Sequence, residues 1–201
     1  MNKAIDILNS LDEIGKKRFM PSIGPTKGKI IADIIREHKP KKILEIGSLY
    51  GYSAILMANV MSDYYDDDDG DEFKVVTVEI DKNNGDIAKI NIKDAELSDK
   101  IDLITGDALE VIPKLHYKFD LLFLDAAKDQ YLQYLRISEE SNIIKKDAII
   151  IADNVGISKN EMIEYLEYVR NSGKYNSKTI ETTLEFSKDI DDAMEVSNRV
   201  V

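Results

Sequence analysis

The sequence predicts an α/β fold: a mostly parallel seven-stranded sheet with helices on both faces and an antiparallel hairpin at its C-terminal edge. Short apolar runs alternate with longer amphipathic stretches over five rounds along the 201 residues. Such alternation is typical of parallel strands connected by helices. The last two β-like stretches follow each other too closely for a helical crossover, so they are expected to pair antiparallel.

The N-terminal part is expected to hold two helices. Apolar residues recur at helical spacing over residues 3–14 and 26–38. Pro40 ends the second stretch, because the residue before a proline avoids the helical region. The segment from Arg18 to Lys27 contains two prolines and a glycine, so it is expected to form an irregular loop.

Strand and helix patterns then alternate to the C-terminus, and the whole chain (1–201) is predicted to be one domain, with residues 1–39 covering the site. The strand patterns occupy residues 42–46, 74–80, 101–104, 120–125 and 148–153, with the hairpin at 178–186 and 193–200. The helical patterns occupy residues 53–61, 82–97, a short stretch ending near 115, 130–141 and 159–171. Ser158 is expected to cap the last helix, whose buried side would be Met162, Ile163, Leu166 and Val169.

The composition excludes several kinds of chemistry. The chain has no cysteine, which removes disulfides, thiolate nucleophiles and cysteine-ligated metals. Its two histidines, His38 and His116, are expected at the surface, and they leave little room for a Ser–His triad. No run approaches the ~20 apolar residues that span a bilayer, and the N-terminus lacks a signal-peptide pattern. These features predict a cytoplasmic protein without a membrane partner.

The formal charge of −11 is concentrated in one segment. Residues 63–72 carry seven acids and no Lys or Arg, so removing these seven charges leaves −4 on the rest of the chain. Such a run is expected to be a solvated loop. Net acidity disfavours a nucleic-acid partner, but Lys16, Lys17 and Arg18 form a local basic patch that could still serve an RNA substrate.

The carboxyl ends of parallel strands are where ligands bind in such a sheet, so the residues that follow each strand are the candidates. Gly47 and Gly51 follow the first strand, where glycines permit a tight turn and a close ligand; a plain strand-to-helix turn is the alternative. Glu79 ends the second strand, where a carboxylate can accept both hydroxyls of a ribose; a solvated acid is the alternative. Asp107 either faces an adenine edge or caps a helix.

The fourth and fifth strands end in oxygen ligands. Asp125 follows one, and Asp153 and Asn154 follow the other. Carboxylates and amide oxygens suit Mg²⁺, although two helix caps would give the same pattern. Lys128 could pair with a carboxylate or act as a base beside a bound cation, whereas an isolated residue of this type would be a surface lysine.

Motifs along most of the chain resemble a known family. They are Gly24-Pro-Thr-Lys27-Gly28, Ile34-Ile-Arg36-Glu37, Leu44-Glu45-Ile-Gly47, Gly51-Tyr52-Ser53-Ala54, Leu124-Asp125, Lys128-Asp129, Tyr131, Ala152-Asp153-Asn154-Val155, Tyr168-Val169-Arg170 and Leu184-Glu185-Phe186. Together they resemble the catechol O-methyltransferases, a family that uses S-adenosylmethionine and a metal ion. The resemblance implies a Rossmann-like methyltransferase fold.

The resemblance also implies roles for individual residues. Asp125, Asp153 and Asn154 would bind Mg²⁺. Lys128 would be the general base for the reacting hydroxyl of a small catechol-type substrate, and Glu185 would hold its second hydroxyl. S-adenosylmethionine would contact Ile23, Glu45, Gly47, Tyr52, Ser53, Glu79, Ile80, Asp107, Ala108 and Asp125. The chain has no tryptophan, and Ala127 and Phe19 stand where the mammalian catechol enzymes have one.

Other functions fit parts of the sequence. Bacterial relatives methylate a hydroxylated tRNA uridine on the same fold, but Glu185 within Leu-Glu-Phe favours the catechol branch. A nicotinamide-dependent oxidoreductase is disfavoured because the Gly-x-Gly-x-x-Gly fingerprint is missing. A non-catalytic binding module is disfavoured because the whole set of candidate site residues is present. A homodimer is among the assemblies that the resemblance allows.

Overall fold

The computed structural model describes residues 2–18, 20–65 and 72–201. Phe19 and residues 66–71 of the acidic segment lie outside the described residues, so the expectations about them stay predictions. The strands are β1 (Lys42–Ile46), β2 (Lys74–Glu79), β3 (Ile101–Thr105), β4 (Phe119–Leu124), β5 (Ile144–Ala152), β6 (Tyr175–Leu184) and β7 (Ser187–Arg199). The helices are α1 (Lys3–Lys17), α2 (Gly24–His38), α3 (Tyr52–Met61), α4 (Lys82–Asp94), α5 (Ala108–Val111), α6 (Tyr131–Glu140) and α7 (Ile163–Asn171), with short 3₁₀ turns at η2 (Ile112–Lys114) and η3 (Lys128–Gln130).

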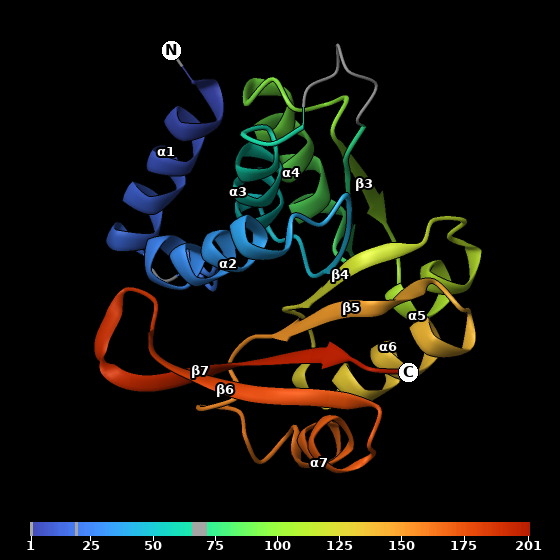
Figure 1. The fold of residues 1–201 in the computed structure, drawn as a ribbon. Coiled ribbons are helices and arrows are strands. Elements are labelled where there is room, and N and C mark those ends of the chain that lie inside the picture. Colours follow the sequence, from blue (N-terminus) through green and yellow to red (C-terminus); the bar gives the residue numbers. More distant parts are fainter. Residues whose placement is uncertain (1, 19, 66–71) are drawn as a thin grey trace.

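The described strands form one seven-stranded sheet in the order β3-β2-β1-β4-β5-β7-β6 (Figure 1). The first five are parallel, whereas β7 runs antiparallel to both β5 and β6. The predicted sheet and its C-terminal edge hairpin are therefore confirmed. The strand order reverses between β1 and β4, which places a ligand-binding crevice at their carboxyl ends.

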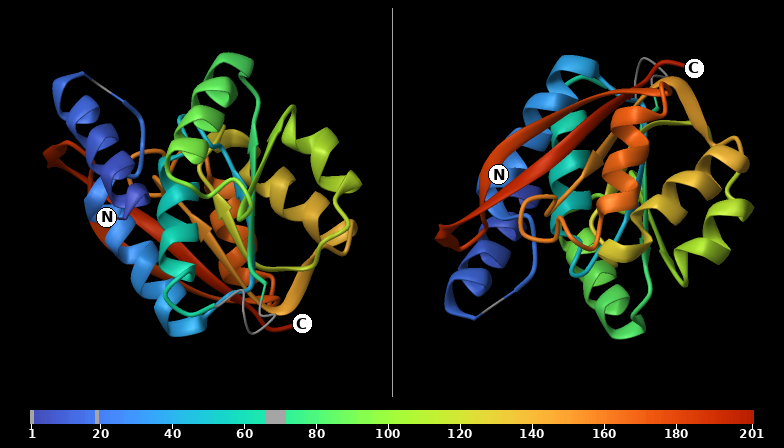
Figure 2. Two further views of the ribbon diagram at one scale, coloured as in Figure 1. Left: turned by 90° about the horizontal axis from the view of Figure 1, so that it is seen from above. Right: turned by 90° about the horizontal axis from the view of Figure 1, so that it is seen from below.

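Two apolar layers cover the two faces of the sheet. Alternate residues of each strand point to opposite faces, so Ile43, Leu121 and Ile149 join one layer, whereas their chain neighbours join the other. Helices α1 to α4 contribute to the first layer and α5 to α7 to the second, and Figure 2 shows the sheet between the two groups of helices. The near-continuous apolar strands reflect burial on both faces.

The region before α7 differs from the prediction. The helix begins at Ile163 with Met162 as N-cap, so the predicted start at 159 and the cap at Ser158 are wrong. The preceding residues form turns, because the backbone N–H groups of Gly156 and Ile157 donate to a side chain of β7 rather than starting a helix. Ile163 is 57% exposed, contrary to the prediction, and the buried face is Met162, Tyr165, Leu166 and Val169.

Further differences concern element ends. Strands β6 and β7 begin at Tyr175 and Ser187, three and six residues before the predicted starts at 178 and 193, and α2 begins at Gly24, within the predicted loop. Strand β5 begins four residues earlier than predicted, at Ile144, because Ile144 pairs with Phe119 across a register shift. Polar residues at 145–147 hide this first part of the strand in the sequence. Helix α4 ends at Asp94 rather than at residue 97.

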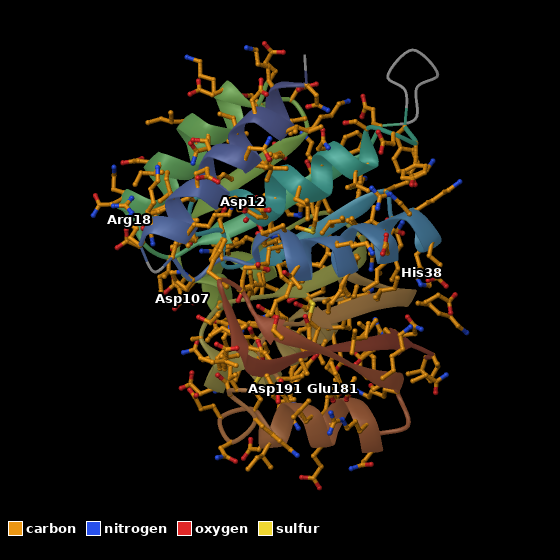
Figure 3. The ribbon with its side chains drawn as sticks, turned by 90° about the vertical axis from the view of Figure 1, so that its left-hand side faces the viewer. Asp12, Arg18, His38, Asp107, Glu181 and Asp191 are labelled. Carbon is orange, nitrogen blue, oxygen red and sulfur yellow. The ribbon has the colours of Figure 1, made fainter. Side chains whose placement is uncertain are left out.

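The two histidines lie at the surface, as predicted. Both His38 and His116 are exposed. Figure 3 shows His38 at the end of α2, on the opposite side of the molecule from Asp107. No helix in the described part of the chain is both long enough and apolar enough to cross a membrane.

Candidate active site

A cavity of about 520 Å³ lies at the carboxyl ends of the central strands. Its size is typical of a small-molecule site. The connection between α1 and α2 lines it through Met20 to Ile23, and the hairpin between β6 and β7 lines it through Leu184 and Glu185. The predicted site residues that line it are Ile23, Gly47, Tyr52, Ser53, Glu79, Ile80, Ala108, Asp125, Lys128, Asp153, Asn154 and Glu185.

The turn after β1 depends on glycine. Gly47 has a φ of +98°, and a Cβ there would lie 2.1 Å from the carbonyl oxygen of Asp125. Only glycine permits this conformation and this approach of β1 to β4. Gly51, also at positive φ, precedes the first residue of α3, so the free N–H groups of the helix begin beside the cavity.

Glu79 is held at the end of β2 by two backbone groups. The N–H of Leu49 donates to Oε2 at 2.7 Å, and the N–H of Asp81 donates to Oε1 at 2.9 Å. Each carboxylate oxygen keeps a further lone pair for a ligand hydroxyl. The neighbouring Ile80 is 72% exposed and lines the same cavity. The cavity therefore has an apolar surface beside the carboxylate of Glu79.

Two predicted cofactor residues, Glu45 and Asp107, do not line the cavity. Glu45 is fully buried in β1, and the hydroxyl of Thr77 donates to its Oε2 at 2.5 Å. Burial raises the pKa of Glu45 to about 8, repulsion from Asp125 and Glu79 adds to this, and hydrogen bonds from Ser53 and Thr77 oppose it. Asp107 accepts the N–H of Leu109 at 2.9 Å as the N-cap of α5, one of its two expected roles.

Two carboxylates meet at one edge of the cavity. Asp125 and Asp153 directly follow Leu124 and Ala152, which are paired in the parallel register of β4 and β5. Burial raises the pKa of Asp153 to about 6, and repulsion from Asp125 adds to it, while Lys27 and Lys128 oppose the rise. Asp153 therefore bears the cost of its burial and of the neighbouring acid, which the two lysines offset in part.

Lys128, in the turn η3 after β4, is held by two side chains. Its Nζ donates to Asp125 Oδ1 and to the hydroxyl of Tyr131, both at 2.8 Å. Tyr131 is fully buried, and its ring meets that of Tyr165 edge-on, with centroids 5.8 Å apart. Tyr131 therefore holds the amine of Lys128 at the cavity wall. Tyr131 belongs to the motifs that carry the family resemblance, but the sequence did not predict this role for it.

Comparison with known proteins identifies the family. A family model described as "O-methyltransferase" matches residues 3–196. The chain belongs to the O-methyltransferase family. It is 30% identical to catechol O-methyltransferase of Mus musculus over 191 residues, covering 92% of this chain and 68% of the relative. It is also 30% identical to catechol O-methyltransferase of Sus scrofa over 181 residues, which covers 88% of this chain and 91% of that one.

A solved structure agrees at the level of the fold. The O-methyltransferase of Bacillus cereus, crystallised in complex with SAH, superposes with a TM-score of 0.81 at 22% identity, covering 99% of this chain and 91% of that one. This supports the Rossmann-like methyltransferase fold. The protein is thus an S-adenosylmethionine-dependent O-methyltransferase related to the catechol O-methyltransferases.

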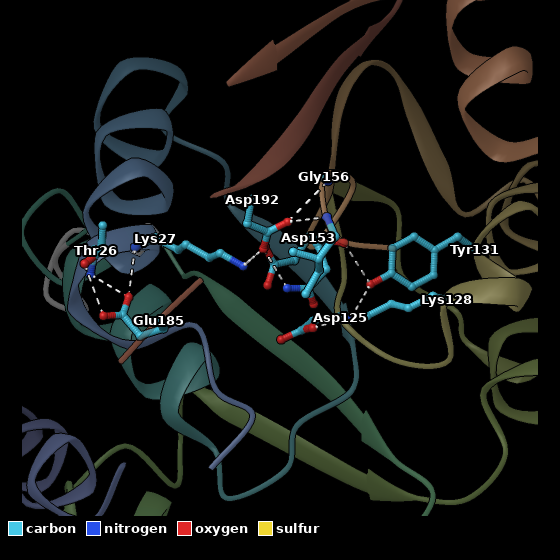
Figure 4. Close-up of polar contacts among 11 residues, drawn as sticks. Thr26, Lys27, Asp125, Lys128, Tyr131, Asp153, Gly156, Glu185 and Asp192 are labelled. Carbon is cyan, nitrogen blue, oxygen red and sulfur yellow. Dashed lines mark hydrogen bonds and ion pairs between the residues drawn. The ribbon is translucent and has the colours of Figure 1, made fainter. Parts of the chain in front are cut away.

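A buried ion-pair cluster, not predicted from the sequence, adjoins the carboxylates of this O-methyltransferase (Figure 4). Lys27 Nζ lies 2.7 Å from Asp153 Oδ1 and 2.6 Å from Asp192 Oδ2, and all three side chains are at most 4% exposed. Burial alone would lower the pKa of Lys27, but the two acids outweigh it and raise the value. Burial alone would raise the pKa of Asp192, but its hydrogen bonds outweigh burial and lower the pKa. The hydrogen bond from Lys27 contributes most to this lowering.

The carboxylate of Glu185 reaches the N-terminus of α2 from the tip of the hairpin. It accepts hydrogen bonds from the N–H groups of Thr26 and Lys27, at 2.9 and 3.4 Å, and from the Thr26 hydroxyl at 3.1 Å. Helix α2 has no side-chain cap of its own, so this carboxylate satisfies groups that would otherwise lack partners. Gly24 leaves the space, since a Cβ there would lie 2.1 Å from Glu185 Cγ.

The donor set at the strand ends fits Mg²⁺. Among the residues that the structure describes, no three acidic or histidine side chains gather into a metal site. A cation would therefore depend on Asp125, Asp153 and the neutral amide of Asn154, completed by waters and substrate oxygens. Few carboxylates with several other oxygen ligands are what Mg²⁺ prefers. Asn154 Nδ2 already donates to Asp192, which leaves its oxygen as the atom available for an ion.

Proposed function

We propose that the protein is a Mg²⁺-dependent O-methyltransferase that transfers the methyl group of S-adenosylmethionine to one hydroxyl of a catechol or a similar vicinal-diol aromatic. The observation that supports it most is the placement of Lys128 against Asp125, beside Asp153, in the same cavity as Glu79 and Gly47. In this proposal a metal site, a base and a site for a nucleoside would share one small cavity.

The methyl donor would be held by the ends of β1 and β2. Glu79 would accept the two ribose hydroxyls, as acidic residues at this position do in related nucleotide folds. The turn at Gly47 and the start of α3 at Ser53 would receive the methionine part, whose carboxylate suits free N–H groups at a helix N-terminus. Ile80 and Ala108 would pack against the adenine.

The acceptor would be held by residues at the ends of β4 and β5. Mg²⁺, when bound by Asp125, Asp153 and Asn154, would orient two neighbouring hydroxyls and favour the phenolate form of one. Lys128 Nζ would take the proton of the reacting hydroxyl, since it is fixed next to the first ligand. In-line displacement at the methyl carbon needs this alignment of oxygen and donor.

Glu185 would accept a hydrogen bond from the hydroxyl that is not methylated. It lines the cavity and is held in place by α2 rather than by a neighbouring strand residue. A diol would then be recognised at both oxygens, one near Lys128 and one near Glu185. Ala127 also lines the cavity, and its small side chain would leave room for substituted rings.

A methyl-transfer assay tests the proposal with three acceptors: catechol, phenol and a tRNA that carries 5-hydroxyuridine. We expect the protein to methylate catechol when Mg²⁺ is added and to methylate phenol only slightly. With excess chelator the rate of catechol methylation should fall at least 100-fold. The variant Asp153→Ala is expected to lose the metal-dependent turnover while retaining S-adenosylmethionine binding. Full activity in chelator, or methylation of the tRNA alone, would overturn the proposal.

A further inference from the structure

The carboxylate of Asp192, in β7, accepts four hydrogen bonds. Its Oδ2 accepts Lys27 Nζ at 2.6 Å and Asn154 Nδ2 at 2.9 Å. Its Oδ1 accepts the backbone N–H groups of Gly156 and Ile157, at 3.2 and 3.1 Å. The residue is 1% exposed, so its carboxylate is buried among four donors.

The antiparallel register explains how Asp192 reaches this place. Ala152 pairs with Glu195, so the residues that precede Glu195 lie beside those that follow Ala152. The N–H of Val155 donates to the carbonyl of Ala193 at 2.9 Å and continues this approach. A Cβ at Gly156 would lie 2.8 Å from backbone atoms of Asp192 and Ala193, so the loop after β5 is fitted closely to β7.

The carboxylate also decides the orientation of the Asn154 amide. An ionised carboxylate only accepts hydrogen bonds, so the amide atom that faces Asp192 must be the nitrogen. The amide oxygen of Asn154 is therefore directed away from Asp192, and Asn154 lines the cavity. The Asn154 backbone has a φ of +60°, a conformation that asparagine tolerates better than most residues.

Lys27 connects the same carboxylate to a second predicted metal ligand. Its Nζ lies between Asp192 and Asp153, with both distances below 2.8 Å. A buried charge with only one partner would be costly, and Lys27 balances two acids at once. Asp192 thus contacts one predicted ligand directly and a second through Lys27.

We propose that Asp192 is a positioning residue for the metal site: it turns the oxygen of Asn154 toward the ion and, through Lys27, fixes the carboxylate of Asp153. It touches neither the ion nor the reacting atoms. The inference rests on the Mg²⁺ site of the proposed function. Groups that orient metal ligands in this way typically change metal affinity by 10- to 100-fold when mutated.

The variant Asp192→Asn tests the orientation directly. Its new amide group can donate to Asn154, which favours a flip that turns the Asn154 N–H group toward the ion. Calorimetric titration with Mg²⁺, at saturating S-adenosylmethionine, is expected to show affinity at least tenfold below that of the wild type. The affinity for S-adenosylmethionine itself is expected to stay within about twofold, because Asp192 does not line the cavity.

The matched control is Glu195→Gln. Glu195 is an equally buried acid on the same strand, and it pairs with Arg170 at 2.7 Å instead of with the site. The Glu195→Gln substitution is expected to lower the melting temperature of the protein without changing its affinity for Mg²⁺. A general loss of stability in β7 would instead weaken Mg²⁺ binding in both variants.

The double variant Asn154→Asp with Asp192→Asn keeps the charge and exchanges donor and acceptor. The new amide at position 192 would donate to one oxygen of the new carboxylate at position 154 and leave the other for the ion. We expect Mg²⁺ affinity to recover in part, because an oxygen at position 154 again faces the ion while the ion pair between position 192 and Lys27 stays lost. This variant also tests the proposal if the single variant does not fold. No loss in Asp192→Asn, or no recovery in the double variant, overturns the inference. Absence of Mg²⁺ binding by the wild type overturns the proposed function and this inference with it.

Discussion

Glu185 and Thr26, 159 residues apart in the sequence, are joined by two hydrogen bonds, from the Thr26 N–H at 2.9 Å and from its hydroxyl at 3.1 Å. The C-terminal hairpin therefore caps the helix that follows the cavity-lining segment at the N-terminus. A negative charge at a helix N-terminus is stabilising by about 0.3–1 kcal/mol at exposed sites. The carboxylate of Glu185 thus both stabilises the contact between the hairpin and α2 and forms part of the cavity wall.

Replacement of Glu185 by glutamine is expected to raise the KM for a catechol at least tenfold, because its amide is a weaker acceptor for the second hydroxyl and for α2. The free energy of unfolding should fall by about 1 kcal/mol. Thr26→Val is the control, since it removes only the hydroxyl bond and should leave KM nearly unchanged. Steady-state kinetics with chemical denaturation measure both effects. Equal KM values for the two variants would contradict a substrate-binding role for Glu185.

Substitution of Gly47 by alanine is expected to be severe. The new Cβ would lie 2.1 Å from the Asp125 carbonyl oxygen, so the ends of β1 and β4 would have to separate. Gly173→Ala is the control: Gly173 has a φ of +73° with no atom within 4 Å of the new Cβ, so it carries only backbone strain of about 1–2 kcal/mol. Calorimetry should show at least tenfold weaker S-adenosylmethionine binding for Gly47→Ala alone. Equal losses in both variants would show that backbone strain, not crowding, is responsible.

Most of the fold follows from local patterns. Each parallel strand contains a short apolar run, and a glycine or an acid stands at its end or directly after it. This is enough to predict a parallel sheet and the edge where Gly47, Glu79, Asp125 and Asp153 meet. The start of α7 could not be predicted in this way. Its first turn is replaced by a loop that Asp192 holds, and this competition depends on a contact 35 residues away in the sequence.

The inner part of the site was not predictable for the same reason. Lys27 stands in a recognisable motif, but in a sequence a lysine is ordinarily solvated, and nothing local shows that two acids surround it. Asp192 follows two other acids of the hairpin, Asp189 and Asp191, which resemble it in the sequence. Only the register of β7 against β5 distinguishes Asp192 from them.

Replacement of Lys128 by arginine is expected to lower kcat about 100- to 1,000-fold, because a guanidinium can pair with Asp125 but cannot accept the proton of the reacting hydroxyl. Affinities for Mg²⁺ and S-adenosylmethionine should change far less, since the positive charge is kept. Single-turnover methylation with rapid quench measures the chemical step. Tyr131→Phe removes one partner of the Lys128 amine and is expected to give a smaller fall in the same rate. A kcat near the wild-type value in Lys128→Arg would exclude Lys128 as the base.

The last prediction concerns Glu45, which is fully buried in β1 and has a pKa raised by burial to about 8. The folded state therefore holds a proton at Glu45 that the unfolded chain releases near pH 4.5. Between these two values the native state binds more protons, so stability falls as the pH rises, by up to about 1.4 kcal/mol per pH unit. This contribution is fully present below pH 4.5 and is lost by about pH 8.

The variant Glu45→Gln is neutral at every pH and should not lose this contribution. Its stability relative to the wild type is therefore expected to increase between pH 5 and pH 8, by a few kcal/mol in total. Urea denaturation of both proteins at the two pH values measures the change, and the other ionisable groups largely cancel because both proteins share them. Since the comparison uses the difference between two pH values, any fixed effect of the amide on packing also cancels. A stability difference that is the same at pH 5 and pH 8 would mean that Glu45 is already ionised in the folded protein at low pH, with its charge compensated by Thr77 and Ser53.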